Sequence, residues 1–182
     1  MKRLPFFILC LFMAAAAGCG DPSKGRRFSD RAMIEANHPQ QETWIIRFVL
    51  TSSGKNRTRV EAGYGAEFKT TSGIEYQLDK GIKVTFFDSK GTLTSTMTAQ
   101  KAIMHGNHDI DVSGNVVLLS GGNTVIRTDY ARWTASDGMI RSSRPVSISR
   151  PGEVIRGQGF ESDQGMIRYR IFQGSGEAVI NK

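Results

Sequence analysis

Turn-forming residues divide the stretch Asp111–Arg141 into short apolar runs, and this pattern limits the possible folds more than any other feature. Gly114-Asn115 opens the stretch, Gly121-Gly122-Asn123 divides it, and Asp137-Gly138 closes the next turn. Such groups supply the positive φ angles that tight hairpins need. The runs Val116–Leu119 and Val125–Trp133 are rich in β-branched residues and lack a 3.6-residue period. The stretch therefore predicts β-hairpins rather than a helix.

The same arrangement recurs along the chain. Val84, Val116 and Val146 each begin a strand, a glycine turn and a second strand, at intervals of 32 and 30 residues. A period of about 30 residues with paired strands predicts stacked layers. One layer cannot bury its apolar face alone, so neighbouring layers must share one apolar interior. The first and last strands of such a stack keep open edges, which can accept a partner strand.

The segments upstream of this stretch also have the composition of strands. Thr43–Thr51, Arg57–Lys69 and Ile74–Leu78 are candidates, with further turns at 53–56, 88–91 and 105–107. Apolar and polar residues alternate within several of them, which predicts one apolar and one solvated face. With 20 glycines in 182 residues, the chain is expected to form an all-β domain over residues 43–182.

The N-terminal residues have the layout of an export leader. A positive end precedes about 14 apolar residues, which is too short for a membrane-spanning helix. Ala16-Ala17-Gly18-Cys19 resembles a bacterial lipobox, so we expect a lipoprotein signal peptide over 1–18 and lipidation of Cys19. A cleaved soluble leader and an uncleaved anchor are the alternatives. Residues 19–42 are polar and predict a tether. Cys10 and Cys19 both precede the domain, which therefore folds without a disulfide.

The charge of the chain is moderately basic. The formal net charge is +7, and without the leader's Lys2 and Arg3 it is +5, from 22 basic and 17 acidic residues. This charge fits a solvated surface or an attraction to phosphate groups. No basic run alternates with aromatic residues as in a nucleic-acid groove, so no nucleic-acid partner is expected.

The sequence contains no recognisable catalytic or metal site. Its histidines are His38, His105 and His108, and the last two are interpreted as residues of an exposed turn. Gly157 and Gly159 are followed by no helix, so they predict a bulge or a close backbone approach instead of a phosphate loop. No cofactor or metal is expected. Scattered carboxylates leave a carbohydrate-cleaving enzyme as a remote alternative.

Several motifs, taken in order, resemble the LptC family of periplasmic components of the bacterial lipopolysaccharide export machine. The resemblance covers about residues 43–172. Many members carry a transmembrane helix where this chain has a lipoprotein-like leader. The motifs are Val84–Asp88 with Gly91, Ala99 with Ala102, Gly114-Asn115-Val116, Thr128-Asp129 with Trp133, Ile140–Val146 and Gly157–Asp163.

The resemblance implies an open, twisted β-jellyroll of stacked antiparallel strands, as in OstA and LptA, whose interior holds the acyl chains of lipid A. It implies a non-enzymatic carrier on the periplasmic face of the inner membrane of a Gram-negative bacterium. The lipobox-like leader adds the expectation that a lipid anchor holds the carrier there. The carrier would receive lipopolysaccharide from the LptB, LptF and LptG complex and pass it to LptA. A purely structural adaptor between that complex and the periplasmic bridge is the alternative.

Two sets of candidate site residues follow. The C-terminal edge expected to dock LptA consists of Met166, Ile167, Arg168, Tyr169, Arg170, Ile171 and Phe172. The choice of lipid-binding residues depends on which alternate residues of each strand face the interior, since a slip of one residue turns every side chain to the opposite face. The expected inward-facing residues are Phe48, Val84, Phe86, Ala99, Val116, Leu118, Val125, Trp133, Val146, Ile148 and Phe160. Trp44 is also expected in the core.

Overall fold

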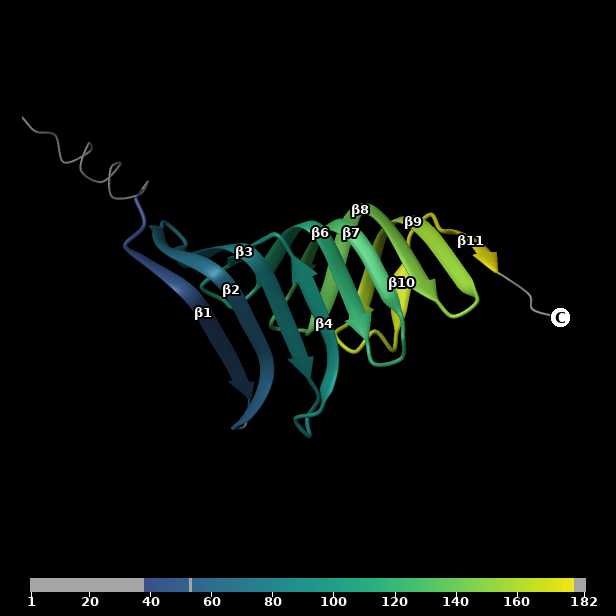
Figure 1. Ribbon diagram of the computed structural model, residues 1–182, viewed down its shortest axis with the longest axis horizontal. Coiled ribbons are helices and arrows are strands. Elements are labelled where there is room, and N and C mark those ends of the chain that lie inside the picture. Colours follow the sequence, from purple (N-terminus) through teal and green to yellow (C-terminus); the bar gives the residue numbers. More distant parts are fainter. Residues whose placement is uncertain (1–37, 53, 179–182) are drawn as a thin grey trace, which may run out of the picture. The chain divides into compact units, whose positions relative to one another are not determined.

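The computed structural model describes residues 38–52 and 54–178, which form one antiparallel sheet of eleven strands (Figure 1). The predicted all-β class is thereby confirmed. The leader, Cys19 and most of the tether lie outside the described residues, so lipidation stays a prediction. The strands are β1 (Gln41–Ser52), β2 (Lys55–Thr70), β3 (Gly73–Phe87), β4 (Leu93–Ala99), β5 (Lys101–Met104), β6 (Ile110–Ser120), β7 (Val125–Trp133), β8 (Met139–Arg150), β9 (Glu153–Asp163), β10 (Tyr169–Ile171) and β11 (Ser175–Ala178).

Nearly every strand pairs with its neighbour in the chain, so the sheet grows as a meander from β1 to β10. Two positions in the sheet are each filled by a pair of short strands. β4 and β5 both lie between β3 and β6, and β10 and β11 both pair with β9. Among the described strands, β1 and β10 each have one hydrogen-bonded neighbour, so both ends of the sheet are open.

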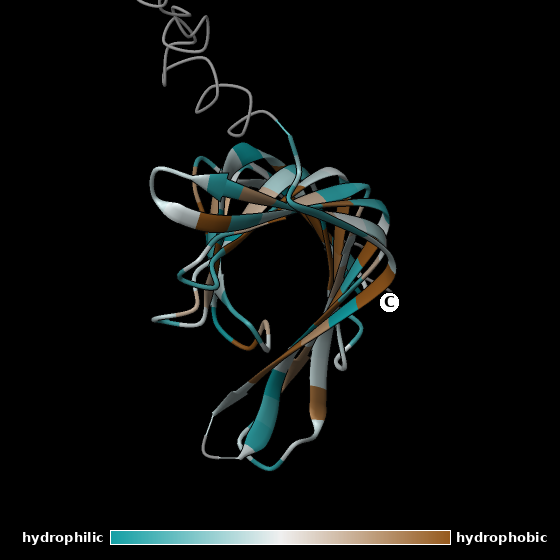
Figure 2. Ribbon diagram, turned by 90° about the vertical axis from the view of Figure 1, so that its left-hand side faces the viewer, coloured by the Kyte–Doolittle hydropathy of each residue, from teal (hydrophilic) through white to brown (hydrophobic). Residues whose placement is uncertain are grey.

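Irregular positions inside the long strands line up across the sheet. The register shifts between Ala62 and Tyr64 on β2, between Ser113 and Val116 on β6, and within β7 and β8 as well. Bulges bend a strand and increase its twist. Aligned in neighbouring strands, they fold the whole sheet along one seam. Figure 2 shows the strands curving around a common interior, as in the expected open jellyroll.

This seam corrects two sequence-based boundaries. Gly114 and Asn115, predicted as a hairpin turn, have φ angles of 79° and 49° but lie inside the continuous strand β6. Lys80 and Gly81 likewise interrupt β3 without ending it. In each case both flanks stay paired with neighbouring strands, so the positive φ angles kink the strand instead of reversing the chain. The turns predicted at 88–91, 105–107, 121–123 and 137–138 are confirmed.

The seam divides the curved sheet into two halves. The core lies between these halves, and both contribute side chains to it. Phe86 and Trp133 face each other there, with ring centroids 5.7 Å apart. Burial of this much apolar surface is the main stabilising term available to a domain without disulfides. The buried cluster contains Val60, Ala62, Leu78, Ile82, Val84, Phe86, Met97, Ala102, Met104, Ile110, Val112, Val116, Leu118, Ile126, Ala131, Trp133, Ile140, Val146, Ile148, Phe160 and Met166.

Candidate functional site

The apolar interior is the candidate functional site, and most of the residues expected there do lie in it. Eight of them belong to the buried cluster, namely Val84, Phe86, Val116, Leu118, Trp133, Val146, Ile148 and Phe160. Phe48 and Ala99 are partly buried and pack against the cluster. The strands therefore bring together side chains that are more than a hundred residues apart in the sequence.

Val125 is the exception among the expected inward residues. Its side chain is only partly buried, and it lies opposite Leu119, which is 47% exposed. The inward residue is Ile126, which is fully buried. The register shift between Thr128 and Arg132 explains the error. A bulge with an odd number of extra residues reverses the side to which the strand's residues point, so Val125 and Trp133 cannot both face inward.

Trp44 also differs from expectation, since 61% of its surface is exposed. Ile45 has a φ of 60° and no partner on β2, so it kinks β1 between Trp44 and Ile46 without shifting the register between the two strands. Ile46 packs against the core, whereas Trp44 turns outward, where its ring makes an edge contact with Tyr64 at 5.6 Å.

The interior is less covered at the β1 end of the sheet. Ile46, Phe48 and Leu50 face inward but are only half-buried, because β1 pairs with β2 on one side and no described strand covers its other side. Phe48 contacts the Tyr76 ring at 4.8 Å. A cavity of about 290 Å³ lies beside these residues. Apolar side chains of the interior are thus accessible at this end of the sheet.

A second cavity, of about 570 Å³, lies between the end of β1–β2 and the β7–β8 turn. Leu50, Trp133 and Ala135 contribute its apolar lining. Gln164, in the β9–β10 loop, also lines it and ties that loop to the opposite part of the sheet. Its carbonyl oxygen accepts a hydrogen bond from Ser95 Oγ, and its Nε2 lies 3.5 Å from the carbonyl oxygen of Phe87.

The expected C-terminal edge, Met166–Phe172, divides into two parts. Met166 is 4% exposed and belongs to the core cluster, so it is not an edge residue. Tyr169–Ile171 forms β10, the last strand in the sheet order. Gly157 on β9 allows the chain after β10 to lie close to it, because a Cβ there would lie 2.7 Å from the carbonyl oxygen of Phe172. The predicted close backbone approach at Gly157 is confirmed.

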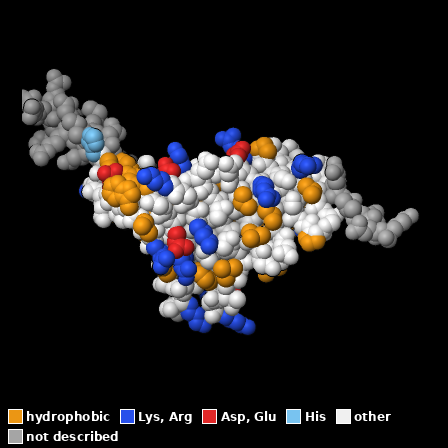
Figure 3. Space-filling view, viewed as in Figure 1, with side chains coloured by type: hydrophobic (Ala, Val, Ile, Leu, Met, Phe, Trp, Pro, Cys, Tyr) orange, Lys and Arg blue, Asp and Glu red, His pale blue; other side chains and the backbone are white. Residues whose placement is uncertain are grey.

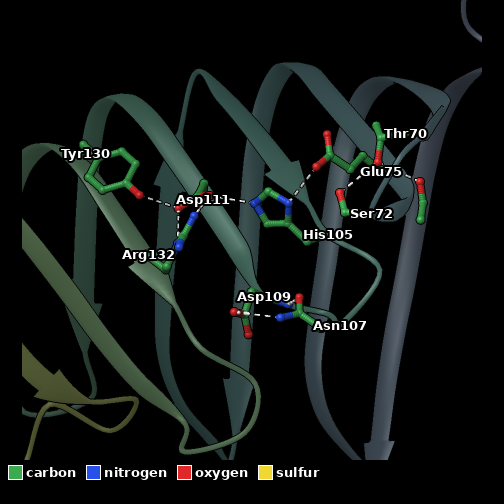
Figure 4. A network of polar contacts seen from close by, with 10 residues as sticks. Thr70, Ser72, Glu75, His105, Asn107, Asp109, Asp111, Tyr130 and Arg132 are labelled. Carbon is green, nitrogen blue, oxygen red and sulfur yellow. Dashed lines mark hydrogen bonds and ion pairs between the residues drawn. The ribbon is translucent and has the colours of Figure 1, made fainter. Parts of the chain in front are cut away.

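A polar network on the outer face of the sheet was not foreseen from the sequence (Figure 4). His105, expected in an exposed turn, is half-buried between Glu75 on β3 and Asp111 on β6, with nitrogen–oxygen distances of 3.0 and 2.7 Å. Asp111 also accepts hydrogen bonds from Tyr130 and from Arg132, whose Nε lies 2.6 Å away. The alternation Ile110, Asp111, Val112 indicated an outward carboxylate, but not its partners.

The network shifts the ionisation of its members. Burial alone would raise the pKa of Asp111, but hydrogen bonds from Arg132, Tyr130 and His105 outweigh it and lower the pKa to about 2. The hydrogen bond to Asp111 raises the pKa of His105 against the opposing effect of burial, and Glu75 adds to the increase. The network thus joins β3, β6 and β7 through hydrogen bonds in which Asp111 and Arg132 are charged.

We expect Asp111→Asn to lower the free energy of unfolding by about 2 kcal/mol at pH 7, because the amide cannot replace the charged partner of Arg132. The lowered pKa of Asp111 means that its contribution is present above about pH 4 and is lost as the pH falls toward 2. The contribution of His105 has the opposite sign: it is present below about pH 6.5 and is lost as the pH rises through the raised pKa. Urea unfolding at pH 2.5, 5, 7 and 9 measures both effects.

Asp129→Asn is the matched control, since Asp129 is exposed on β7 and forms no ion pair with a described residue. It should change stability by less than about 0.5 kcal/mol. A difference between wild type and Asp111→Asn that is equally large at pH 2.5 and pH 7 would contradict the assignment.

Two further kinds of feature are absent from the described part of the chain. No group of three His, Cys, Asp or Glu side chains within it is arranged to hold a metal ion. Nor does it contain a helix with the length and apolar character needed to cross a bilayer. The features that stand out are an apolar interior, open strand edges and cavities along the interior.

Together, the folded antiparallel sheet and its continuous apolar interior define the class of open β-jellyroll proteins. A family model described as lipopolysaccharide-assembly, LptC-related, matches residues 35–167. The chain therefore belongs to the LptC family, which takes part in lipopolysaccharide transport in the cell envelope. A search of curated proteins found no significant match.

Proposed function

We propose that this protein is a non-enzymatic carrier that holds the acyl chains of lipopolysaccharide in its interior. The observation that carries the proposal is the continuous apolar cluster that runs the length of the sheet and stays partly open at β1. Each methylene moved from water into such an interior gains about 0.8 kcal/mol. Transfer between similar interiors is then nearly balanced, so the direction of transport must be set by an external energy source.

The two open ends of the sheet support a route through the carrier. In this proposal the LptB, LptF and LptG complex delivers lipid on the periplasmic face of the inner membrane, and LptA receives it at β10. An open strand edge can pair with a partner strand, which would align one interior with the next. The half-buried Phe48 at the β1 end supports such continuity.

Leu118 and Leu119 provide a test within one dipeptide. Leu118 is 1% exposed and faces the interior, whereas Leu119 is 47% exposed on the outer face. We expect a photoreactive residue at position 118 to capture lipopolysaccharide in cells at least about ten times more often than one at 119, because acyl chains partition to the apolar side. Immunoblotting of crosslinked adducts with an antibody against the polysaccharide measures the ratio.

Equal capture at both positions, or none at either, would argue against the carrier. A structural adaptor would then account better for the protein. It predicts that export still depends on the edge strand Tyr169–Ile171 while interior positions never contact lipid.

A further inference from the structure

The 570 Å³ cavity at the end of the interior has a lining that favours hydrogen-bond acceptors. Arg57, His108 and Gln164 contribute N–H groups, and none of the described residues that line the cavity carries a carboxylate. Leu50, Trp133 and Ala135 connect the same cavity to the apolar interior, since all three are in the core cluster or pack against it. The cavity is therefore amphipathic, with an apolar base and a polar rim that donates hydrogen bonds.

Two polar atoms of residues that line this cavity have no partner among the described residues. They are Thr58 Oγ1 and Trp133 Nε1, and both atoms are fully buried. Buried polar groups in folded proteins are almost always hydrogen-bonded, and leaving one unpaired is costly. The indole N–H can only donate, so an acceptor is the group that it lacks.

The charged groups at this end of the molecule also favour an anionic ligand. No described carboxylate forms an ion pair with Arg57. Asp88, on the nearby β3–β4 turn, directs its carboxylate to the backbone N–H groups of Lys90 and Thr92, both at 2.8 Å. In Figure 3, Lys and Arg side chains gather at the lower tip of the molecule, over the β1–β2 and β3–β4 turns. An anionic group would be attracted to this rim.

We propose that this cavity binds the phosphate monoester of an acylated headgroup whose acyl chains enter the interior. The inference rests on the proposed carrier function and adds to it a seat for the headgroup. Arg57 would pair with the phosphate through charge-assisted hydrogen bonds, and His108 and Gln164 would donate to its remaining oxygens. In this proposal, an acyl chain that enters the interior displaces the side chains that cover Thr58 Oγ1 and Trp133 Nε1, and these atoms then donate to acceptors at the junction of headgroup and acyl chain.

The test compares two lipids that differ only in phosphate, namely bis-phosphorylated lipid A and the same lipid A after dephosphorylation. Each is titrated into the full-length protein in micelles, and binding is read from displacement of a fluorescent fatty acid. We expect Arg57→Gln to weaken binding of the phosphorylated form about 10-fold and to leave the dephosphorylated form within about 2-fold. Arg127→Gln, at an exposed arginine of β7 outside this cavity, should leave both affinities unchanged.

Thr58→Val gives a second readout, because it keeps the shape of the side chain and removes only the unpaired hydroxyl. The melting temperature of the lipid-free protein should stay the same or rise, whereas lipid binding should weaken about 3-fold. A lower melting temperature together with unchanged binding would mean that the hydroxyl has a structural role, and would overturn its assignment to the ligand.

The remaining outcomes separate this inference from the carrier function. If dephosphorylated lipid A binds but Arg57→Gln and Arg127→Gln behave alike, the headgroup seat is wrong and the carrier stands. If neither lipid binds the wild type, both are wrong. If inorganic phosphate displaces the phosphorylated lipid from the wild type at micromolar concentration, the cavity is a site for free phosphate and the lipid assignment fails.

Discussion

Phe86→Ala is expected to lower the free energy of unfolding by about 3–5 kcal/mol, the range typical of a large aromatic removed from a core. Phe86 is fully buried and packs against Trp133 from the opposite half of the folded sheet. The substitution removes both the buried area of the ring and the contact that holds the two halves together. Because small domains are stable by only about 5–15 kcal/mol, the variant should unfold at much lower urea concentration, as measured by circular dichroism.

Leu93→Ala is the control for Phe86→Ala, since Leu93 lies on the neighbouring strand β4 and is 53% exposed. It should cost less than about 1 kcal/mol. A similar loss for the two variants would mean that the interior at Phe86 is loosely packed, and would contradict a continuous core at this point.

Gly157→Ala is expected to detach the C-terminal edge of the sheet. The added Cβ would overlap the Ile171 side chain and would lie 2.7 Å from the carbonyl oxygen of Phe172. β9 is held by β8 on its other side, so β10 and the residues after it are the part able to move. Overpacking of this kind costs about 1–3 kcal/mol. Hydrogen exchange at Tyr169–Ile171 should become at least tenfold faster, while exchange in β6 and β7 should stay unchanged.

Gly165→Ala is the matched control in the adjacent loop, where the nearest atom to an added Cβ, on Ile167, is 3.6 Å away. It should leave the exchange rates of β10 unchanged. If β10 is the docking edge for LptA, Gly157→Ala should also weaken that association, whereas Gly165→Ala should not. Unchanged protection of β10 in Gly157→Ala would show that the C-terminal segment can shift without unpairing.

The alternation of apolar residues identified much of the core correctly. Even-numbered inward positions continue through β3, from Leu78 to Ile82 and Phe86, and through β6, from Val112 to Val116 and Leu118. In both strands the kink involves two positive-φ residues, which leaves the parity of the strand unchanged. The residues predicted to face inward after these kinks, Val84 and Phe86 on β3 and Val116 and Leu118 on β6, were therefore assigned to the correct face.

Where an irregular position in a strand reverses which alternate residues face inward, the same reasoning fails. In β7 the buried positions change from Ile126 and Thr128 to Ala131 and Trp133. No glycine or proline in β7 marks this change, so nothing local could have excluded Val125. In β1, the kink that turns Trp44 outward is centred on Ile45, a β-branched residue, and such residues rarely adopt a positive φ.

The sequence by itself determined the class of fold, the turns, the family resemblance and most of the apolar interior, because these depend on local backbone preferences and on a period of two residues. The tertiary structure decided which turn-like pairs are kinks inside long strands, and it brought Glu75, His105, Asp111 and Arg132 into one network. It also placed Arg57 and Trp133 around one cavity. These features depend on pairing between strands that are distant in the chain, and such pairing is fixed only when the whole sheet folds around its core.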